Sequence, residues 1–204
     1  APCGLAGQAV PAGGPEVTRA LLDAGIELAR DGGPGAVVLR EATRRAGVVP
    51  NAAYRHFGSR QELLLAVREA ALAAAATAME KELAVLPCDQ PPVDFARAQV
   101  RAIGTGYLRF AQAEPGLFRT AFVVSSEDAE GEVGPARAGA SGKDPFQLLG
   151  AAIDRLVEAG ALDPSHRPNA EYLAWSAVHG LALLIIEGPL KGMDAQSSHA
   201  LGQR

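Results

Sequence analysis

Residues 39–60 read LREATRRAGVVPNAAYRHFGSR, and this stretch constrains the fold more than any other part of the chain. Gly47 ends a first helical segment, because glycine readily takes the left-handed conformation that follows many helices. Pro50 suits the first turn of the next segment, where its missing N–H costs little. The stretch predicts a short helix over 39–46, a tight turn, and a second short helix over 50–57.

The rest of the chain is also patterned as helices. Residues 16–30 place apolar side chains on one helical face, at spacings of three and four. Ser59 followed by Glu62 is the pattern of a helix N-cap, and it predicts a long helix that continues to about Leu86. Further helices are expected over 94–113, 116–124, 145–158 and 168–187. No useful length alternates like a strand, so we predict an all-α protein.

Composition divides this helical chain into segments. We expect a flexible tail over 1–15, a helix-turn-helix domain over 16–60, a second helical domain over 61–190 and a tail over 191–204. The helix over 60–86 links the two domains. Residues 125–144 have almost no large apolar side chains and predict a mobile loop.

Several function classes find no support in the sequence. The two cysteines, Cys3 and Cys88, have no nearby cysteine partner, and the four histidines lack metal-ligand spacing. We therefore predict no metal site, no cofactor and no catalytic residues, and the chain is not expected to be an enzyme. No apolar run approaches the roughly 18–20 residues of a membrane span. The prediction is a cytoplasmic protein without membrane contact.

Positive charge is concentrated in the predicted helix-turn-helix. Residues 36–60 contain five basic residues and one acid, a local charge of 5 − 1 = +4 in a chain whose net charge is −4. In a helix-turn-helix the second helix enters the DNA major groove. A basic surface of this kind favours DNA binding, whereas the alternative is an ordinary helical hairpin with a solvated basic face.

Individual side chains of this unit suit different contacts with DNA. Asn51 has the amide that can pair with an adenine edge. Tyr54, His56 and Arg60 suit phosphate oxygens, which position a protein without reading sequence. Arg40 is expected to reach the groove or the backbone. Val48, Ala53 and Phe57 lie on the side predicted to pack inward, whereas Ala52 shares the outer face with His56.

The stretches LLDAGIELARDGG and LREATRRAGVVPNAAYRHFGSRQELLLAV resemble the DNA-binding domain of TetR-type transcriptional regulators. GYLRFAQAEPGLFRTAF and WSAVHGLALLIIEGPL resemble the ligand-sensing domain of a TetR subgroup with a Trp-x-x-x-His-Gly motif, here Trp175, His179 and Gly180. The resemblance places DNA contacts at Arg40, Pro50, Asn51, Tyr54, Arg55, His56 and Arg60. Val49 departs from the family pattern, because it replaces the Ser or Thr that usually caps the recognition helix.

The second half of the chain contains most of the aromatic residues. The resemblance implies an apolar ligand pocket there. Its candidate residues are Tyr107, Phe110, Phe118, Phe122, Trp175 and His179. The alternative for each aromatic residue is simple core packing, and for His179 it is a hydrogen-bonded packing role.

Two predicted helices, over about 145–159 and 168–187, are apolar on more than one face, which suggests a partner surface. The corresponding helices of TetR proteins form a dimer interface. The candidate interface residues are Phe146, Leu149, Ile153, Val178, Leu181 and Ile185.

Together these features predict a homodimeric repressor. It would bind a palindromic double-stranded DNA operator and be released by a small, mostly apolar effector. Two alternatives remain: an activator or ligand-independent regulator of the same fold, and a helical small-molecule-binding protein with a vestigial helix-turn-helix.

Overall fold

The computed structural model describes residues 14–122 and 135–203, and the secondary structure of this part is helical throughout. The α-helices are α1 (Pro15–Gly32), α2 (Leu39–Ala46), α3 (Pro50–His56), α4 (Arg60–Ala84), α5 (Pro92–Ala113), α6 (Pro115–Ala121), α7 (Pro145–Glu158), α8 (Ala170–Ile186) and α9 (Ala195–Gly202). Short 3₁₀ turns lie at Pro34–Ala36, Pro135–Arg137 and Pro164–His166. The all-α prediction is confirmed.

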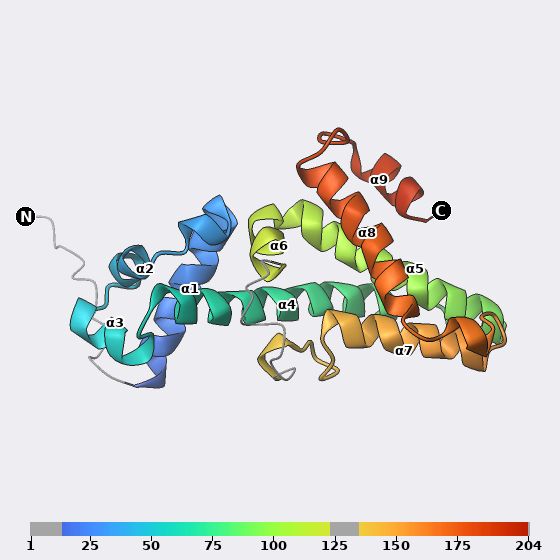
Figure 1. The fold of residues 1–204 in the computed structure, drawn as a ribbon, viewed down its shortest axis with the longest axis horizontal. Coiled ribbons are helices and arrows are strands. Elements are labelled where there is room, and N and C mark those ends of the chain that lie inside the picture. The colour runs from blue at the N-terminus through green and yellow to red at the C-terminus, as the bar shows by residue number, and fades with distance from the viewer. Residues whose placement is uncertain (1–13, 123–134, 204) are drawn as a thin grey trace, which may run out of the picture.

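The long helix α4 organises the molecule (Figure 1). Helices α1, α2 and α3 lie at the end where α4 begins, α5, α6 and α7 pack along the rest of α4, and α8 and α9 pack on α5. The most extensive helix pairing is between α4 and α5, and α4 also packs against α6 and α1. The helix-turn-helix end and the larger helical end therefore share one continuous element.

Local sequence signals set the helix boundaries at the helix-turn-helix end. Gly47 takes φ +65° after α2, and Pro50 is the first residue of α3, as predicted. The Ser59 hydroxyl accepts a 3.1 Å hydrogen bond from the Glu62 backbone N–H. The Glu62 carboxylate in turn accepts from the Gly58 N–H at 2.8 Å, so two side chains accept hydrogen bonds from backbone N–H groups at the start of α4.

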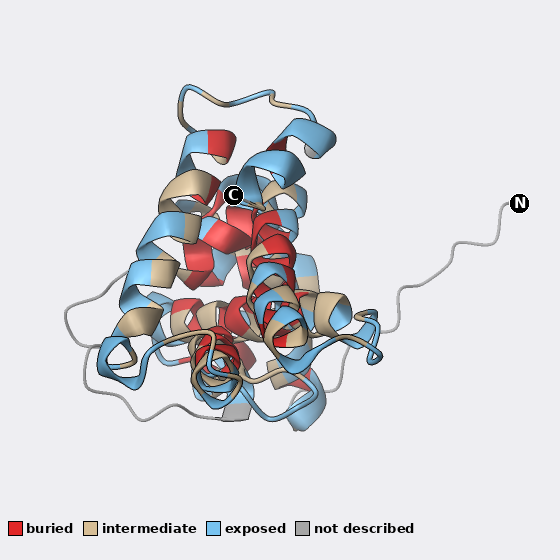
Figure 2. Ribbon diagram, turned by 90° about the vertical axis from the view of Figure 1, so that its right-hand side faces the viewer, coloured by how far each residue is buried: buried red, intermediate tan, exposed pale blue. Residues whose placement is uncertain are grey.

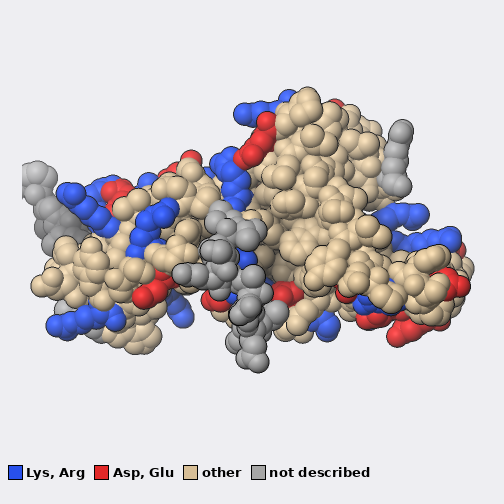
Figure 3. All heavy atoms as spheres, in the orientation of Figure 1, with Lys and Arg blue, Asp and Glu red and all other residues tan. Residues whose placement is uncertain are grey.

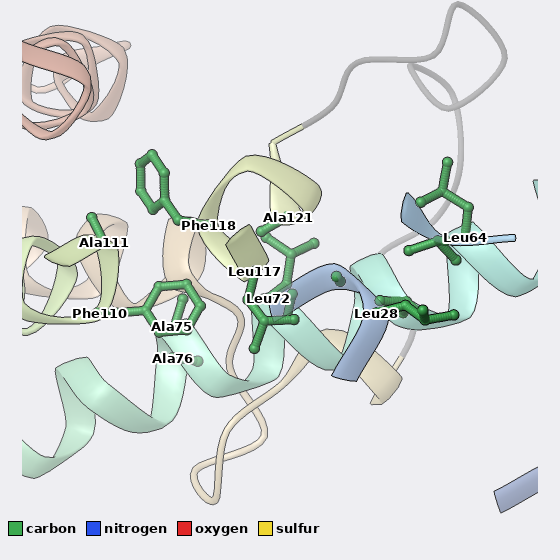
Figure 4. Close-up of a cluster of buried hydrophobic side chains, with 14 of the residues drawn as sticks. Leu28, Leu64, Leu72, Ala75, Ala76, Phe110, Ala111, Leu117, Phe118 and Ala121 are labelled. Atoms are coloured by element: carbon green, nitrogen blue, oxygen red, sulfur yellow. The ribbon is translucent and has the colours of Figure 1, made fainter. Parts of the chain in front are cut away.

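A single apolar core runs from one end of the molecule to the other. Viewed from the end in Figure 2, the buried residues lie toward the middle of the helices and the exposed ones on the outside. Its central part joins side chains of four helices, as Figure 4 shows: Leu28 of α1, Leu72 of α4, Phe110 of α5 and Leu117 of α6. Gly116 allows the close approach of α6 to α1, because an added Cβ would lie 2.2 Å from the Ala29 carbonyl oxygen. The two ends are thus packed together rather than merely linked.

The segment predicted as a tail over 191–204 contains helix α9. The Asp194 side chain caps this helix by accepting from the Ser197 N–H at 2.9 Å. Ser198 is 1% exposed, and its hydroxyl accepts from the Gln112 side chain of α5 at 3.1 Å. Segment 191–204 has few large apolar residues, so its docking was not visible as a hydrophobic pattern.

The remaining predicted segments lie partly outside the described residues. Of the tail expected over 1–15 and the loop expected over 125–144, residues 1–13 and 125–134 are not described, nor are residues 123–124 of the helix expected over 116–124. The described part of the loop contains the 3₁₀ turn Pro135–Arg137, and Asp144 forms a capping box with Gln147 at the start of α7.

Candidate nucleic-acid interface and ligand cavity

The α2–turn–α3 unit is held in place by its small inward face. Val48, Ala53 and Phe57 are buried against the rest of the core, as their helical positions predicted. Ala52 is buried as well, at 5% exposure, which corrects its expected place on the outer face. Methyl groups at both alanine positions allow α3 to pack closely on its inner side while the opposite side stays exposed.

The outer face of α3 presents Asn51, Tyr54 and Arg55 to solvent. Tyr54 is 58% exposed, an unusual position for a large aromatic side chain with no ligand. Arg40 of α2 is also exposed, and within residues 14–122 and 135–203 none of these four side chains makes a hydrogen bond or ion pair. Their polar groups are therefore available to an external partner.

His56 is held by a residue that the sequence did not single out. The Thr18 hydroxyl of α1 lies 2.9 Å from Nδ1 of the half-buried His56 ring. When the hydroxyl donates to Nδ1, the proton of a neutral imidazole lies on Nε2. Thr18 is 38 positions away in the sequence, so only the fold brings this pair together.

Arg60 has a different environment from the one expected. Its Nε donates to the Val37 carbonyl and its Nη2 to the Pro34 carbonyl, both at 2.8 Å. The guanidinium therefore holds the connection between α1 and α2 in place. Only its remaining N–H groups are left for a phosphate, and that contact stays a prediction.

Ion pairing reduces the free positive charge of the unit. Arg44 donates two hydrogen bonds to Glu41, and Arg45 pairs with Asp31 at 2.9 Å. The Arg44 hydrogen bonds are the main reason that the pKa of Glu41 falls to about 2, with Arg45 adding to the effect. Among the described residues of α2 and α3, the arginines without such a partner are Arg40 and Arg55, so the effective charge is smaller than the sequence sum suggested.

The N-terminus of α3 lacks a side-chain cap. Val49 occupies the N-cap position, is 59% exposed and makes no side-chain hydrogen bond. Pro50 follows as the exposed first residue of the helix, where it leaves no N–H to be satisfied. The Ala52 and Ala53 N–H groups donate to the Val49 carbonyl, so within the described chain the Asn51 N–H is the one in this first turn without an acceptor.

The larger helical end contains a cavity of about 400 Å³. Helices α4, α5, α7, α8 and α9 all contribute to its wall. The lining residues are Met79, Val100, Arg101, Ile103, Gly104, Tyr107, Pro145, Phe146, Leu149, Ala174, Trp175, Ala177, Val178, Leu181, Leu201, Gly202 and Gln203. Its volume is within the range of about 300–1,000 Å³ that is common for small-molecule sites.

A chain of hydrogen bonds closes one side of this cavity. Trp175 Nε1 donates to the Tyr107 hydroxyl at 3.2 Å, and that hydroxyl lies 2.7 Å from Nδ1 of His179. Burial raises the pKa of Tyr107 and lowers the pKa of His179, so both groups are neutral at pH 7. The Tyr107 hydroxyl accepts from Trp175, and it donates to His179 Nδ1 when the imidazole proton lies on Nε2.

The predicted pocket residues divide between the cavity wall and the core. Tyr107 and Trp175 line the cavity. Phe118 and Phe122 pack around His179, with ring centroids 5.4 and 5.2 Å from the imidazole. None of these three residues lines the cavity. Phe110 is buried in the core. His179 is hydrogen-bonded to Tyr107 and packed among aromatic rings, and a contact between His179 and a ligand stays a prediction.

Two family comparisons match most of the chain. Residues 21–67 match the family described as "Bacterial regulatory proteins, tetR family". Residues 100–204 match "Tetracyclin repressor-like, C-terminal domain", which covers just over half of the chain.

The chain belongs to the TetR family.

Solved structures agree with this TetR-family fold. A protein of unknown function from Rhodococcus sp. RHA1 has a TM-score of 0.72 and 24% identity, over 97% of this chain and 95% of that one. The TetR family transcriptional regulator PfmR from Thermus thermophilus has a TM-score of 0.54 and 21% identity, over 89% of this chain and 94% of that one. No curated protein matches the sequence. Trp175, His179 and Gly180 share α8, but neither family description mentions their motif, so the subgroup stays a prediction.

The residues predicted for a TetR-type dimer interface point mostly inward. Leu149, Ile153 and Ile185 are buried within the protomer. Phe146, Val178 and Leu181 are half-buried and pack on the same core or line the cavity. The sequence identified two helices rich in apolar residues, but the side of each helix that stays exposed depends on how α5, α7 and α8 pack together.

The described part of this TetR-family chain has neither a cluster of metal ligands nor a membrane-spanning helix. Within residues 14–122 and 135–203, no group of three or more His, Cys, Asp and Glu residues could hold a metal ion. No described helix is long and apolar enough to cross a membrane.

Proposed function

We propose that this TetR-family protein is a cytoplasmic, homodimeric repressor that binds a palindromic DNA operator and leaves it when a small, mostly apolar molecule enters the cavity. The observation that carries the proposal is the outer face of α3, where Asn51, Tyr54 and Arg55 are exposed without partners in the described chain. An amide, a phenol and a guanidinium on one helical face are suited to base edges and phosphates.

Contacts between the two ends support a response to ligand. Arg30 at the end of α1 pairs with Glu114, the residue before α6, at 3.1 Å. Arg119 of α6 pairs with Glu187, the residue after α8, at 3.0 Å. Helix α6 therefore touches both the helix-turn-helix end and the helix that carries Trp175. A ligand that favours one position of α8 would bias the position of α1 through these contacts.

An exposed face of α8 supports dimerisation. Tyr172, Leu173, Leu183 and Leu184 are between 38% and 76% exposed in the protomer. Gly180 lies between them, and a Cβ added there would meet no atom within 4 Å. Glycine within a helix costs about 0.5–1 kcal/mol relative to alanine, and no contact inside the protomer requires it. We propose that this face, rather than the six residues predicted from the sequence, meets the partner.

The surface over this part of the molecule is consistent with such a contact. Figure 3 shows a broad area without Lys, Arg, Asp or Glu over α8 and the neighbouring helices. A twofold interface there would present two α3 helices to successive major grooves, roughly 34–36 Å apart on DNA.

The experiment is DNA binding measured by fluorescence anisotropy. The labelled DNA is the region upstream of the protein's own gene, titrated at several salt concentrations. Arg55→Ala is expected to weaken binding about tenfold and to reduce the salt dependence, because it removes an unpartnered phosphate contact. Arg44→Ala is the matched control: it removes the same charge from the same unit, but Arg44 is already paired with Glu41.

If the wild-type protein shows no salt-sensitive binding to this DNA, the proposal is abandoned. Transcription measured with and without the gene distinguishes repression from activation. If Arg44→Ala and Arg55→Ala lost DNA affinity to the same extent, net charge rather than the α3 face would govern DNA binding.

A further inference from the structure

We propose that the cavity binds an organic carboxylate, with its apolar body inside and its carboxylate on Arg101. This inference rests on the proposed ligand response, because it names the class of molecule that would occupy the same cavity. It depends on the distribution of charge and of unsatisfied polar groups around the cavity wall.

The wall is mainly apolar and favours an apolar body. Met79, Ile103, Phe146, Leu149 and Val178 come from four helices and face the same space. Burial of apolar surface in such a site provides most of the affinity for a small ligand, whereas a few polar groups set its orientation.

The polar side chains of the wall other than Arg101 are already engaged in hydrogen bonds. Trp175 Nε1 donates to Tyr107, and the Tyr107 hydroxyl is shared with His179. Gln203 donates from its amide nitrogen to the Thr105 hydroxyl at 2.9 Å. A ligand group placed against these residues would compete with existing hydrogen bonds, so this part of the cavity offers little to an anion.

Arg101 differs from the rest of the wall. It is the single charged residue among the described residues that line the cavity, and no acidic residue of the described chain lines it. It is exposed and makes no hydrogen bond or ion pair within residues 14–122 and 135–203. A cationic ligand would find no counter-charge here, whereas an anion would find one unpartnered guanidinium.

The geometry of the side chain selects the type of anion. A guanidinium presents parallel N–H donors that match the two oxygens of a carboxylate. Its position on the exposed side places the carboxylate near water, so neither charge needs to be fully desolvated. An amphiphile can therefore leave its head at Arg101 and bury its body among the apolar residues.

The test uses the fluorescence of Trp175. This is the one tryptophan of the sequence and it lines the cavity, so its emission reports on occupancy. The full-length protein is titrated with two matched pairs of probes: decanoate with decanol, and para-butylbenzoate with para-butylbenzyl alcohol. The variants are Arg101→Gln and, as the control, Arg97→Gln. Arg97 is exposed one turn earlier on α5 and does not line the cavity.

At least one carboxylate is expected to bind the wild-type protein more tightly than its alcohol. Arg101→Gln should weaken the binding of that carboxylate about fivefold, the upper range for an exposed ion pair. It should change the affinity for the matching alcohol less than about twofold. Arg97→Gln should change the affinity for either probe by no more than about twofold. Equal binding of acid and alcohol, equal effects of the two variants, or no binding of either carboxylate would overturn the inference.

A separate measurement distinguishes this inference from the proposed function. If the carboxylate binds through Arg101 but DNA occupancy is unchanged, the ligand-released repressor is rejected and the carboxylate site stands. If instead an alcohol releases DNA and the carboxylates do not bind, the repressor stands and the carboxylate inference fails.

Discussion

At the scale of single residues, the hydrogen bond between Thr18 and His56 would prepare the proposed contact of His56 with DNA. The 2.9 Å contact between the Thr18 hydroxyl and His56 Nδ1 holds the ring beside the exposed face of α3. A ring held in one orientation loses less conformational freedom when Nε2 binds a phosphate. We therefore expect Thr18 to act as a positioning residue, because its own hydroxyl is occupied by the histidine.

We expect Thr18→Val to weaken DNA binding about three- to tenfold, the equivalent of one hydrogen bond. Thr18→Ser keeps the hydroxyl and should restore most of the affinity. Fluorescence anisotropy measures both, and the two-dimensional NMR shifts of the His56 ring nitrogens report directly on its tautomer. A loss of affinity in Thr18→Val with an unchanged tautomer would contradict the positioning role.

His179 should make stability depend on pH. Burial lowers its pKa in the folded protein, so the unfolded chain binds more protons just below its ordinary pKa of about 6.5. Stability is therefore expected to fall as pH decreases below about 6.5. His179→Gln removes the titrating group and should flatten this slope in urea unfolding measured between about pH 5 and 7.

The matched control for this pH series is His166→Gln, which replaces an exposed histidine outside the aromatic cluster. It should leave the slope unchanged. A slope that is equally steep in His179→Gln and the wild type would show that another group is responsible.

Among the helices, α6 depends on glycine for its position. A Cβ at Gly116 would lie 2.2 Å from the Ala29 oxygen and 2.5 Å from the Arg30 oxygen, both in the backbone of α1. Backbone atoms cannot move aside as a flexible side chain can. The contact between the two ends of the molecule is therefore sensitive to a single methyl group.

Gly116→Ala is expected to destabilise the protein by about 1–3 kcal/mol, the usual cost of forcing extra volume into a packed contact. Gly35→Ala is the control, because an added Cβ there meets no atom within 4 Å. Its effect should stay within about 0.5 kcal/mol. Urea unfolding measures both, and equal stabilities for the two variants would contradict the proposed close contact.

At the scale of the whole molecule, the exposed face of α8 raises the question of assembly. Leu173 is 76% exposed, and so is another large apolar residue, Val85, at 75% after the end of α4. The two differ in surroundings: Leu173 shares its helix with three other exposed large apolar side chains, whereas Val85 follows the end of its helix. Only the first site belongs to an apolar face suited to a partner.

Leu173→Glu is expected to weaken the dimer at least about tenfold, because it places charge in an apolar contact. Val85→Glu should leave the dimer intact. Sedimentation velocity across a range of protein concentrations compares them. A wild-type protein that is monomeric at all concentrations would refute the assembly, and equal effects of the two substitutions would place the interface elsewhere.

Local chemistry made much of the fold predictable. Gly47, Pro50 and Ser59 act on the backbone within a few residues of themselves, so their positions alone indicated where α2, α3 and α4 begin or end. The exposed side of α3 followed from the same helical spacing, apart from the burial of Ala52. Helix α9 was missed because its order depends on contacts with α5 rather than on its own apolar pattern.

The sequence by itself determined the all-α class, the helix-turn-helix and the residues that could face DNA, because helix periodicity and turn chemistry are local. Tertiary structure alone decided which of those residues are free: Arg60 is directed to the Pro34 and Val37 carbonyls, while Arg55 is left without a partner in the described chain. It also placed Arg101 at the cavity and turned Leu149 and Ile153 inward. Such outcomes depend on groups far apart along the chain, and only the packing of the helices brings them within contact distance.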